Sequence, residues 1–386
     1  MTTAPDPTPA NSAPPAGSAC PAESAAPTAC PDCLARAWLL GRLAGHLDVV
    51  RARIDRLLDL ADDDLIEAVA GSHVSQVRDE RAGFDPDAYA RRCARAGLEV
   101  VCRCDPAYPT GLWALPAEPA VLHVAGGVER LARLAGAEAV AVVGARRASP
   151  YALENARTLS RDLARAEVTV VSGMAAGVDA AAHAGALEAS GRTVAVLACA
   201  PDRPYPPASG ALHRRIVATA CAVSELGPGV SVRRWMFPAR NRIIAALGAM
   251  TVVVAARRGS GALLTAELAR ELGRPVGAMP GQTTAPLSWG PHELVKAGAR
   301  LVTGVADVMT EVLELGRDDP RAQRRVGAGV PPELEPLFSA LADGLNPTQA
   351  FAEAGLDATE GLATLAALEL AGHIRRQPGG GFLVTT

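Results

Sequence analysis

The sequence is poor in aromatic residues and contains a single lysine, Lys296, among 386 residues. Aromatic side chains make up only 3% of the chain, which excludes extensive base stacking as the main way of binding a nucleic acid. No apolar run reaches the length of a membrane span. The first 29 residues lack the basic and apolar regions of a signal peptide, and their Ala, Pro, Thr and Ser bias predicts a disordered tail. We therefore expect a cytoplasmic protein.

The usual nucleotide motifs are also missing. No GxxxxGK[ST] pattern occurs in the sequence, so the common machinery of nucleotide hydrolysis is not expected. The loop after the first predicted core strand lacks GxGxxG, which argues against a dinucleotide.

Eight cysteines invite a disulfide or metal interpretation. Without secretion signals, a disulfide framework is not expected. Cys30 and Cys33 form a CPDC motif and leave a zinc site open, but no second CxxC or HxxxH pair follows at zinc-finger spacing. We therefore expect ordinary reduced thiols, with no metal and no cofactor.

The formal net charge of -3 hides an uneven distribution. Residues 139–310 carry 19 basic and 11 acidic residues, a net charge of +8, which leaves -11 for the rest of the chain. A basic middle between acidic flanks favours a polyanionic partner for the middle. The alternative is that scattered arginines merely solvate helix surfaces.

The middle of the chain alternates short Val/Ala runs with helical stretches. This pattern is typical of a parallel sheet covered by helices on both faces. We predict an α/β fold with a Rossmann-like core in residues 98–316. The predicted strands span 139–144, 168–173, 193–199, 221–225, 250–256 and 275–281.

Residues 30–97 have helical periodicity and predict a small helical (SAM-like) domain. Three aspartates, at positions 62–64, are expected to cap one of its helices. The leucines expected on one side of the first helical stretch are Leu39, Leu40, Leu43 and Leu47.

The C-terminal residues 333–386 follow a charged, Pro/Gly-rich linker at 317–332. They predict two short helices and a hairpin, with Asp357 as an N-cap and a glycine-rich turn at 378–381. This order indicates a winged-helix module. A helical dimerisation element is the alternative.

Two loops at the carboxyl ends of the predicted strands have features of an anion site. After the first strand, Gly144 allows a turn beside Arg146 and Arg147, and Ser149 can N-cap the next helix. Helix amides and a guanidinium together suit an anion.

After the second strand, Gly173 and Gly177 permit a close approach to the backbone, and Asp179 can cap the helix that carries His183. Ser172 would complete a triad, but the G-x-S-x-G elbow is missing. We therefore expect binding without catalysis.

Two further loops combine arginine, amide and hydroxyl side chains near helix starts, which suits phosphate or base-edge contacts. The candidate residues are Arg240, Asn241 and Arg242 in the first of these loops, and Ser260, Gly261 and Thr265 in the second.

Five motifs occur in one order: VGARRAS, SGMAAGVDAAAHAGAL, FPARNRII, SGALLTAELA and GPHELVKAGA. Over residues 105–310 the chain thereby resembles the DNA-processing protein A family (DprA, also called Smf). The resemblance implies a homodimer that binds single-stranded DNA, protects incoming strands and loads the recombinase RecA in natural transformation; the family is not known for catalysis. The positions that match its motifs are Arg146, Ser172, Gly173, Gly177, Asp179, His183, Arg240, Asn241, Arg242, Ser260, Gly261 and Thr265.

The chain departs from the family pattern at four positions. The residues that replace the usual Glu, basic residue, Asn and Asn are Ala255, Pro207, Ser209 and His292.

Two other functions compete with DNA binding by the core. A nucleotide-processing hydrolase of the lysine-decarboxylase-like (phosphoribohydrolase) type would share a Rossmann core, but its PGGxGTxxE motif appears here as PGQTTAPLS, without the glutamate. A transcription factor would read DNA with its C-terminal module, whose candidate recognition helix is poor in arginine.

Overall fold

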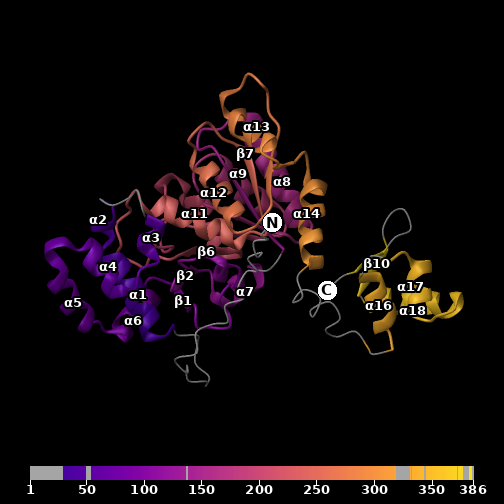
Figure 1. Ribbon diagram of the computed structural model, residues 1–386, viewed down its shortest axis with the longest axis horizontal. Helices are drawn as coiled ribbons and strands as arrows, with labels where there is room; N and C mark the ends of the chain where they lie inside the picture. Colours follow the sequence, from indigo (N-terminus) through magenta and orange to yellow (C-terminus); the bar gives the residue numbers. More distant parts are fainter. Residues whose placement is uncertain are drawn as a thin grey trace, which may run out of the picture.

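A mixed α/β core is built on a sheet of nine strands in the described part of the chain (Figure 1). The computed structural model describes residues 29–48, 54–135, 138–318, 331, 333–342, 345–371, 373–376 and 382–384. The strand order is β1-β2-β6-β5-β4-β3-β7-β8-β9. The strands are β1 (Glu99–Cys102), β2 (Val121–Ala125), β3 (Ala139–Gly144), β4 (Thr169–Ser172), β5 (Thr193–Val196), β6 (Cys221–Ser224), β7 (Met250–Ala255), β8 (Val276–Ala278) and β9 (Arg300–Leu301).

The predicted parallel core is confirmed. All six predicted strands are present as β3 to β8, and every pair between β6 and β9 in the sheet order is parallel. The antiparallel edge formed by β1 and β2 was not predicted. These strands are only four and five residues long, and the segment between them is rich in proline, which masks a strand pattern.

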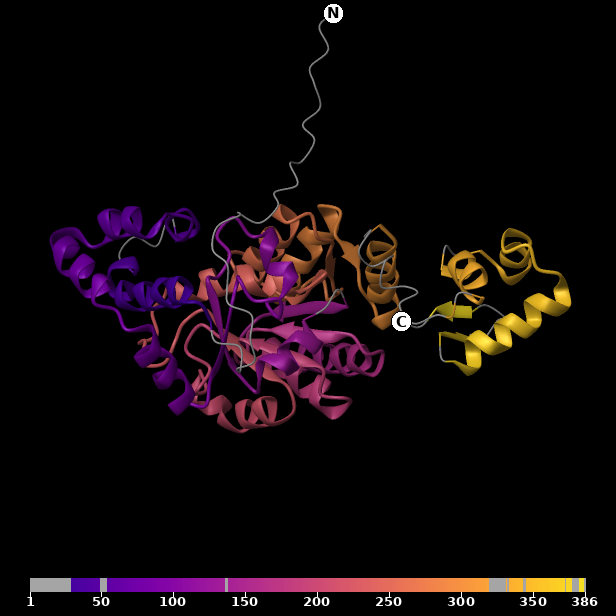
Figure 2. The same cartoon turned by 90° about the horizontal axis from the view of Figure 1, so that it is seen from below.

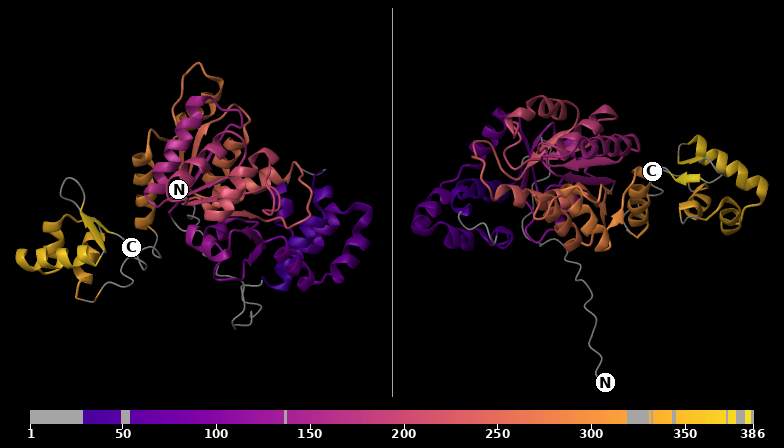
Figure 3. Two further views of the ribbon diagram at one scale, coloured as in Figure 1. Left: turned by 180° about the vertical axis from the view of Figure 1, so that it is seen from behind. Right: turned by 90° about the horizontal axis from the view of Figure 1, so that it is seen from above.

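Helices cover both faces of this sheet (Figure 2), and Figure 3 shows the same layers from behind and from above. Successive side chains of a strand point to opposite faces. On β3, Val140 and Val142 pack in the cluster with α8 and α9, whereas Ala139, Ala141 and Val143 pack in the cluster with α11 and α12. The helices of the core are α7 (Val128–Leu134), α8 (Pro150–Arg165), α9 (Val178–Glu188), α10 (Gly210–Thr219), α11 (Met236–Leu247), α12 (Gly261–Glu271), α13 (Trp289–Lys296) and α14 (Val305–Asp318).

The strand order reverses direction at β3. From β3 the chain adds β4, β5 and β6 on one side, and then crosses to add β7, β8 and β9 on the other. Ligands of open α/β sheets bind beyond the carboxyl ends of the strands at such a switch point. The loops that follow β3 and β7 therefore flank the place where this fold binds ligands.

The N-terminal helices pack against the start of α11. The indole N–H of Trp235 donates to the Ala44 carbonyl at 2.9 Å, and the Asp48 carboxylate accepts from the backbone N–H of Arg234 at 2.9 Å. The four predicted leucines are all buried. The helices are α1 (Pro31–Arg42), α2 (Ala44–Leu47), α3 (Ile54–Leu58), α4 (Asp62–Val69), α5 (Val74–Ala82) and α6 (Pro86–Arg95).

The predicted aspartate cap of α4 is wrong. The N-cap position is Ala61, without a side-chain cap, and the aspartates form the first turn. Asp62 instead pairs with Arg36 at 2.8 Å and with Arg81 at 2.6 Å, because two arginines from neighbouring helices reach it.

The C-terminal module has its own hydrophobic core, which includes Leu337, Phe338 and Leu365. Asp357 is the N-cap of its longest helix, as predicted, and forms a capping box with Glu360. The predicted turn at 378–381, the tail before residue 29 and most of the linker lie outside the described residues. The elements are α16 (Glu335–Ala342), α17 (Pro347–Glu353), α18 (Ala358–Leu370), β10 (Ile374–Arg376) and β11 (Phe382–Val384).

Within the residues that the structure describes, no helix is both long enough and apolar enough to cross a membrane.

Candidate functional site

The loop after β3 presents two arginines next to a helix start. Arg146 and Arg147 are exposed. Ser149 is the N-cap of α8, as predicted, and its hydroxyl accepts from the Ala152 N–H at 3.3 Å, with Pro150 as the first helical residue. The loop thus combines exposed positive charge with the positive end of a 16-residue helix, which favours an anion.

Two glycines bring α9 against this loop. A side chain on Gly144 would come within 2.7 Å of the Val178 side chain, in the first turn of α9. Gly177 has a φ of 88°, and a side chain there would overlap the Ala145 and Arg146 carbonyls. The loop that bears the exposed arginines therefore rests directly on the N-terminus of α9, and only glycine at 177 allows this contact.

Asp179 does not cap α9 as predicted. The N-cap is Gly177, without a side-chain cap, and Asp179 lies in the first turn. Its carboxylate, only 5% exposed, accepts from the Gly173 N–H at 3.2 Å. Burial raises the pKa of Asp179, while the charge of Arg240 and the backbone N–H groups of Ala175, Gly144 and Gly173 act in the opposite direction. An internal carboxylate thus occupies the Gly173 amide, one of those that the sequence suggested for a phosphate.

Ser172 and His183 are fully buried. The Ser172 hydroxyl donates to the Val142 carbonyl at 2.6 Å. The Thr193 hydroxyl donates to the Val170 carbonyl at 2.7 Å, so it accepts from Nδ1–H of His183, also at 2.7 Å. Burial lowers the pKa of His183 to about 3. Through these hydrogen bonds Ser172 links β4 to β3, and His183 links α9 to β5. The arrangement is not that of a catalytic triad.

The three candidates on α11 are also buried. The sequence placed this run at a helix start, but α11 begins at Met236, so the run lies in its second turn. Arg240 Nη1 donates to the Val196 carbonyl at 2.8 Å, and its guanidinium occupies the space where a Gly173 side chain would lie. Burial lowers the pKa of Arg240, and the Asp179 charge acts against this.

The other two residues of the run tie α11 to its neighbours. Arg242 Nη2 donates to both carboxylate oxygens of Glu225 at 2.7 Å, and both side chains are less than 10% exposed. Asn241 Nδ2 donates to the Gly261 carbonyl at 3.2 Å. These contacts link α11 to the end of β6 and to the start of α12, so this run organises the edge from within.

The loop after β7 carries the second exposed arginine pair, Arg257 and Arg258. Ser260 is the N-cap of α12, as predicted, and accepts from the Ala262 N–H at 3.3 Å. Gly261 is exposed, whereas Thr265 is buried and its hydroxyl donates to the Gly261 carbonyl at 3.2 Å. The two loops at the switch point therefore share the same arrangement, in which two exposed arginines are followed by a serine-capped helix.

Two aromatic side chains beside this edge were missed by sequence reasoning. The Arg146 guanidinium lies over the Phe237 ring at 5.1 Å, and the Phe237 and Tyr205 ring centroids are 5.6 Å apart. Tyr205 is 39% exposed. Both residues precede a proline next to a motif, but the low aromatic content gave no reason to single them out.

Within the described ranges, one group of three or more Cys, His, Asp or Glu side chains could hold a metal, and it lies outside these loops. The strand-end edge thus offers fixed helix ends and exposed arginines, which can bind an anion.

Comparisons with known proteins point in one direction. The sequence profile of the family described as DNA recombination-mediator protein A matches residues 99–313, and that of the DprA winged helix domain matches residues 329–380. The chain is 39% identical over 277 residues to a protein of Mycobacterium tuberculosis named as a DNA processing protein DprA, a match that covers 68% of this chain and 66% of that protein, just under two thirds of its length.

Two solved structures are similar as well. DNA processing protein A from Streptococcus pneumoniae matches with a TM-score of 0.59 and 31% identity, covering 72% of this chain and 96% of that chain. The structure from Helicobacter pylori, described as a single-stranded DNA binding mode of DNA processing protein A, matches with a TM-score of 0.51 and 26% identity, covering 57% and 98%.

Acid should destabilise this fold through its two fully buried histidines, His183 and His123. Burial lowers their pKa values to about 3 and about 4, below the 6.5 of an unburied histidine. The unfolded state therefore takes up these protons first. The contribution of the two neutral histidines to the free energy of unfolding is complete above pH 6.5. It is lost as the pH falls toward their pKa values in the folded protein, at about 1.4 kcal/mol per pH unit for each histidine.

His183→Leu should remove about half of the contribution that His183 and His123 together make to this slope. The measurement is the free energy of unfolding in urea at several pH values below neutrality. An unchanged slope in the His183 variant would contradict the assignment.

Proposed function

Because this chain belongs to the DNA recombination-mediator protein A family, we propose that it binds single-stranded DNA along the edge where β3 and β7 end. The Helicobacter pylori relative, which shares this fold, is described as binding single-stranded DNA. The observation that carries the proposal is the pair of matching loops at the switch point. Arg146, Arg147, Arg257 and Arg258 are all exposed there, and each pair precedes a serine-capped helix.

The proposed contacts divide into two groups. Exposed arginines of the two loops bind phosphates directly, since arginine forks match phosphate geometry. The buried candidates support them: Asp179 and Arg240 shape the loop after β4, and Arg242 fixes α11. Ser172 and His183 act in the same way, through the packing of β4 and α9. Phosphate contacts give affinity without strong sequence preference, which suits a protein that handles any strand.

Tyr205 and Phe237 add one local stacking surface. The Arg146 guanidinium lies over the Phe237 ring, and the Tyr205 ring packs against Phe237. A base that is not stacked on its neighbours in the strand can stack on the exposed part of Tyr205, because every base has an aromatic face. We propose that this contact favours single strands, since the bases of a duplex are already stacked and paired.

A role in transcription receives less support from the C-terminal module. Its longest helix, α18, contains Glu360 and Glu369 and no basic residue. A recognition helix without arginine or lysine lacks the side chains that most often contact guanine and phosphate.

Binding to single-stranded DNA should depend on Arg146 and on salt. Arg146→Ala should weaken binding about tenfold at low salt, the loss expected for one charge-assisted hydrogen bond of about 1.5 kcal/mol. The slope of log affinity against log salt should become shallower by about 0.7 for each lost phosphate contact. The measurement is fluorescence anisotropy with a labelled oligonucleotide across a salt series, in parallel with its duplex.

The matched control is Arg165→Ala. Arg165 is also exposed, but it lies in the last turn of α8, at the opposite edge of the sheet. The Arg165→Ala variant should bind the single-stranded oligonucleotide like the wild type at every salt concentration. If the Arg146 variant did the same, or if the duplex bound as well as the single strand, the proposed interface would be wrong.

We further propose that the protein is not an enzyme. The Ser172 hydroxyl is engaged by a carbonyl, His183 is buried, and the loop after β8 lacks the glutamate expected for a phosphoribohydrolase. Nucleoside monophosphates, nucleoside triphosphates and oligonucleotides incubated with the protein should yield no products by chromatography. Turnover that disappears in folded Ser172→Ala or His183→Ala protein would overturn this proposal.

Dimer formation and RecA loading complete the proposed role and rest on the family resemblance. RecA loading would place the protein in the cytoplasm with the DNA it binds. Sedimentation velocity should give twice the 39.6 kDa mass of the chain. RecA should join the protein on a single-stranded oligonucleotide in a gel-shift assay. A monomer at micromolar concentration would contradict the first part, and the absence of a ternary complex the second.

A further inference from the structure

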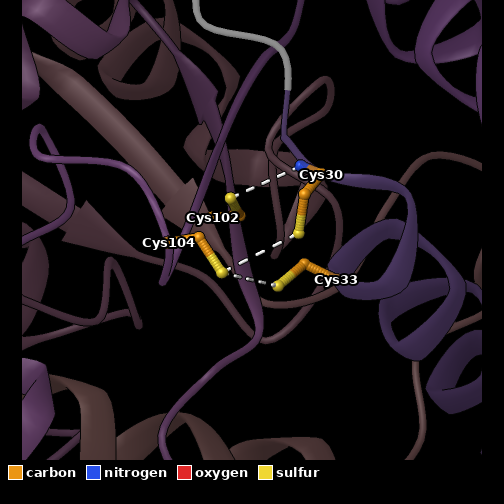
Figure 4. Close-up of side chains that lie close together, drawn as sticks. All are labelled: Cys30, Cys33, Cys102 and Cys104. Carbon is orange, nitrogen blue, oxygen red and sulfur yellow. Dashed lines mark hydrogen bonds between the residues drawn. The ribbon is translucent and has the colours of Figure 1, made fainter. Parts of the chain in front are cut away.

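Four cysteines from two distant segments meet at one point (Figure 4). Cys30 is the N-cap of α1 and Cys33 lies in its first turn; Cys102 ends β1, and Cys104 follows two residues later. All four sulfur atoms lie within 4.8 Å of one another. The Cys104 sulfur is 3.8 Å from that of Cys30 and 3.9 Å from that of Cys33.

These distances are those of a tetrahedral thiolate site. Zinc–sulfur bonds of about 2.3 Å in tetrahedral geometry separate the sulfur atoms by about 3.8 Å. The four side chains already stand at nearly this spacing, from an N-terminal CxxC and a strand-end CxC. We propose that Cys30, Cys33, Cys102 and Cys104 bind one zinc ion.

The surroundings suit the negative charge of four thiolates around Zn²⁺. The backbone N–H of Cys30 points to the Cys102 sulfur at 3.5 Å. Cys30 and Cys33 lie at the N-terminus of the 12-residue helix α1, whose dipole favours negative charge. Arg103, between two of the ligands, pairs with Glu118 at 2.6 Å. Such contacts around the ligands orient them and tune their charge.

Other occupants fit the cluster less well. Calcium and magnesium prefer oxygen ligands, whereas an all-sulfur tetrahedral set selects zinc or iron. A multi-iron cluster would hold the thiolates further apart, since several irons and sulfides would stand between them. A disulfide joins sulfur atoms at about 2.05 Å, far closer than the pairs observed here, and it would use only two of the four.

The position of the site defines its role. Four protein ligands leave no open position for substrate, so the site is structural. Cys33 and Cys104 are 71 residues apart in sequence, and the metal would tie the start of the N-terminal helices to the edge strand of the sheet. It would thereby close a long loop that includes every N-terminal helix.

The test uses full-length protein purified without chelator. Its readout is the metal content of the protein, which does not depend on whether the protein binds DNA. Elemental analysis should find about one zinc per chain. Cys104→Ser, at the most exposed ligand, should lose nearly all of it and melt at a lower temperature, whereas Cys199→Ala, a buried cysteine outside the cluster, should keep the metal. Cobalt substitution should give the visible absorption of tetrahedral cobalt thiolate in the wild type and not in Cys104→Ser.

Three results would overturn the proposal. One is wild-type protein with far less than one zinc per chain after exposure to zinc. Another is stoichiometric iron in its place. The third is a disulfide among these cysteines, detected by mass spectrometry of the untreated protein. Each is read on the wild type, so the outcome does not depend on whether a variant folds.

Discussion

The burial of the Arg240 guanidinium is the constraint on which the strand-end edge depends. The guanidinium fills the space that Gly173 leaves free, and its charge offsets that of the buried Asp179 carboxylate. Without this cation, the charged form of Asp179 would lose a favourable interaction in the interior, where burial already raises its pKa. The carboxylate in turn holds the backbone after β4, against which the exposed arginines of the first loop are positioned through Gly177. Buried charge therefore determines where exposed charge is presented.

The features that depend on neighbours in sequence could be predicted. Ser149 and Ser260 cap the helices they precede because the hydroxyl and the amides it accepts from are two or three residues apart. The core strands were equally accessible, since burial on both faces requires continuous apolar runs. The burial of Arg242 could not be read in this way. Arginine is rarely buried unless it is paired, and its partner, Glu225, belongs to a different strand end.

The same limit explains two features that the local sequence pattern did not reveal. The glycine-rich segment after β4 resembles a phosphate cradle, but the chain supplies its own anion from Asp179. The CPDC motif has no partner at zinc-finger spacing, because its counterpart is a CxC at the end of an edge strand that the sequence pattern did not reveal. In both cases the fold brings in a group that the local pattern does not contain. The first turn of α9 supplies the Asp179 carboxylate, and the pairing of β1 with β2 positions Cys102.

The anchoring of Trp235 has a consequence for how this architecture can be inherited. Helix α11, which contains Arg240 and Arg242, begins directly after a tryptophan that is hydrogen-bonded to Ala44, and its preceding amides are held by Asp48. The N-terminal helices and the sheet are consequently not interchangeable modules. A recombination event that replaced one without the other would have to recreate this contact at once, so the two regions should evolve as a single unit.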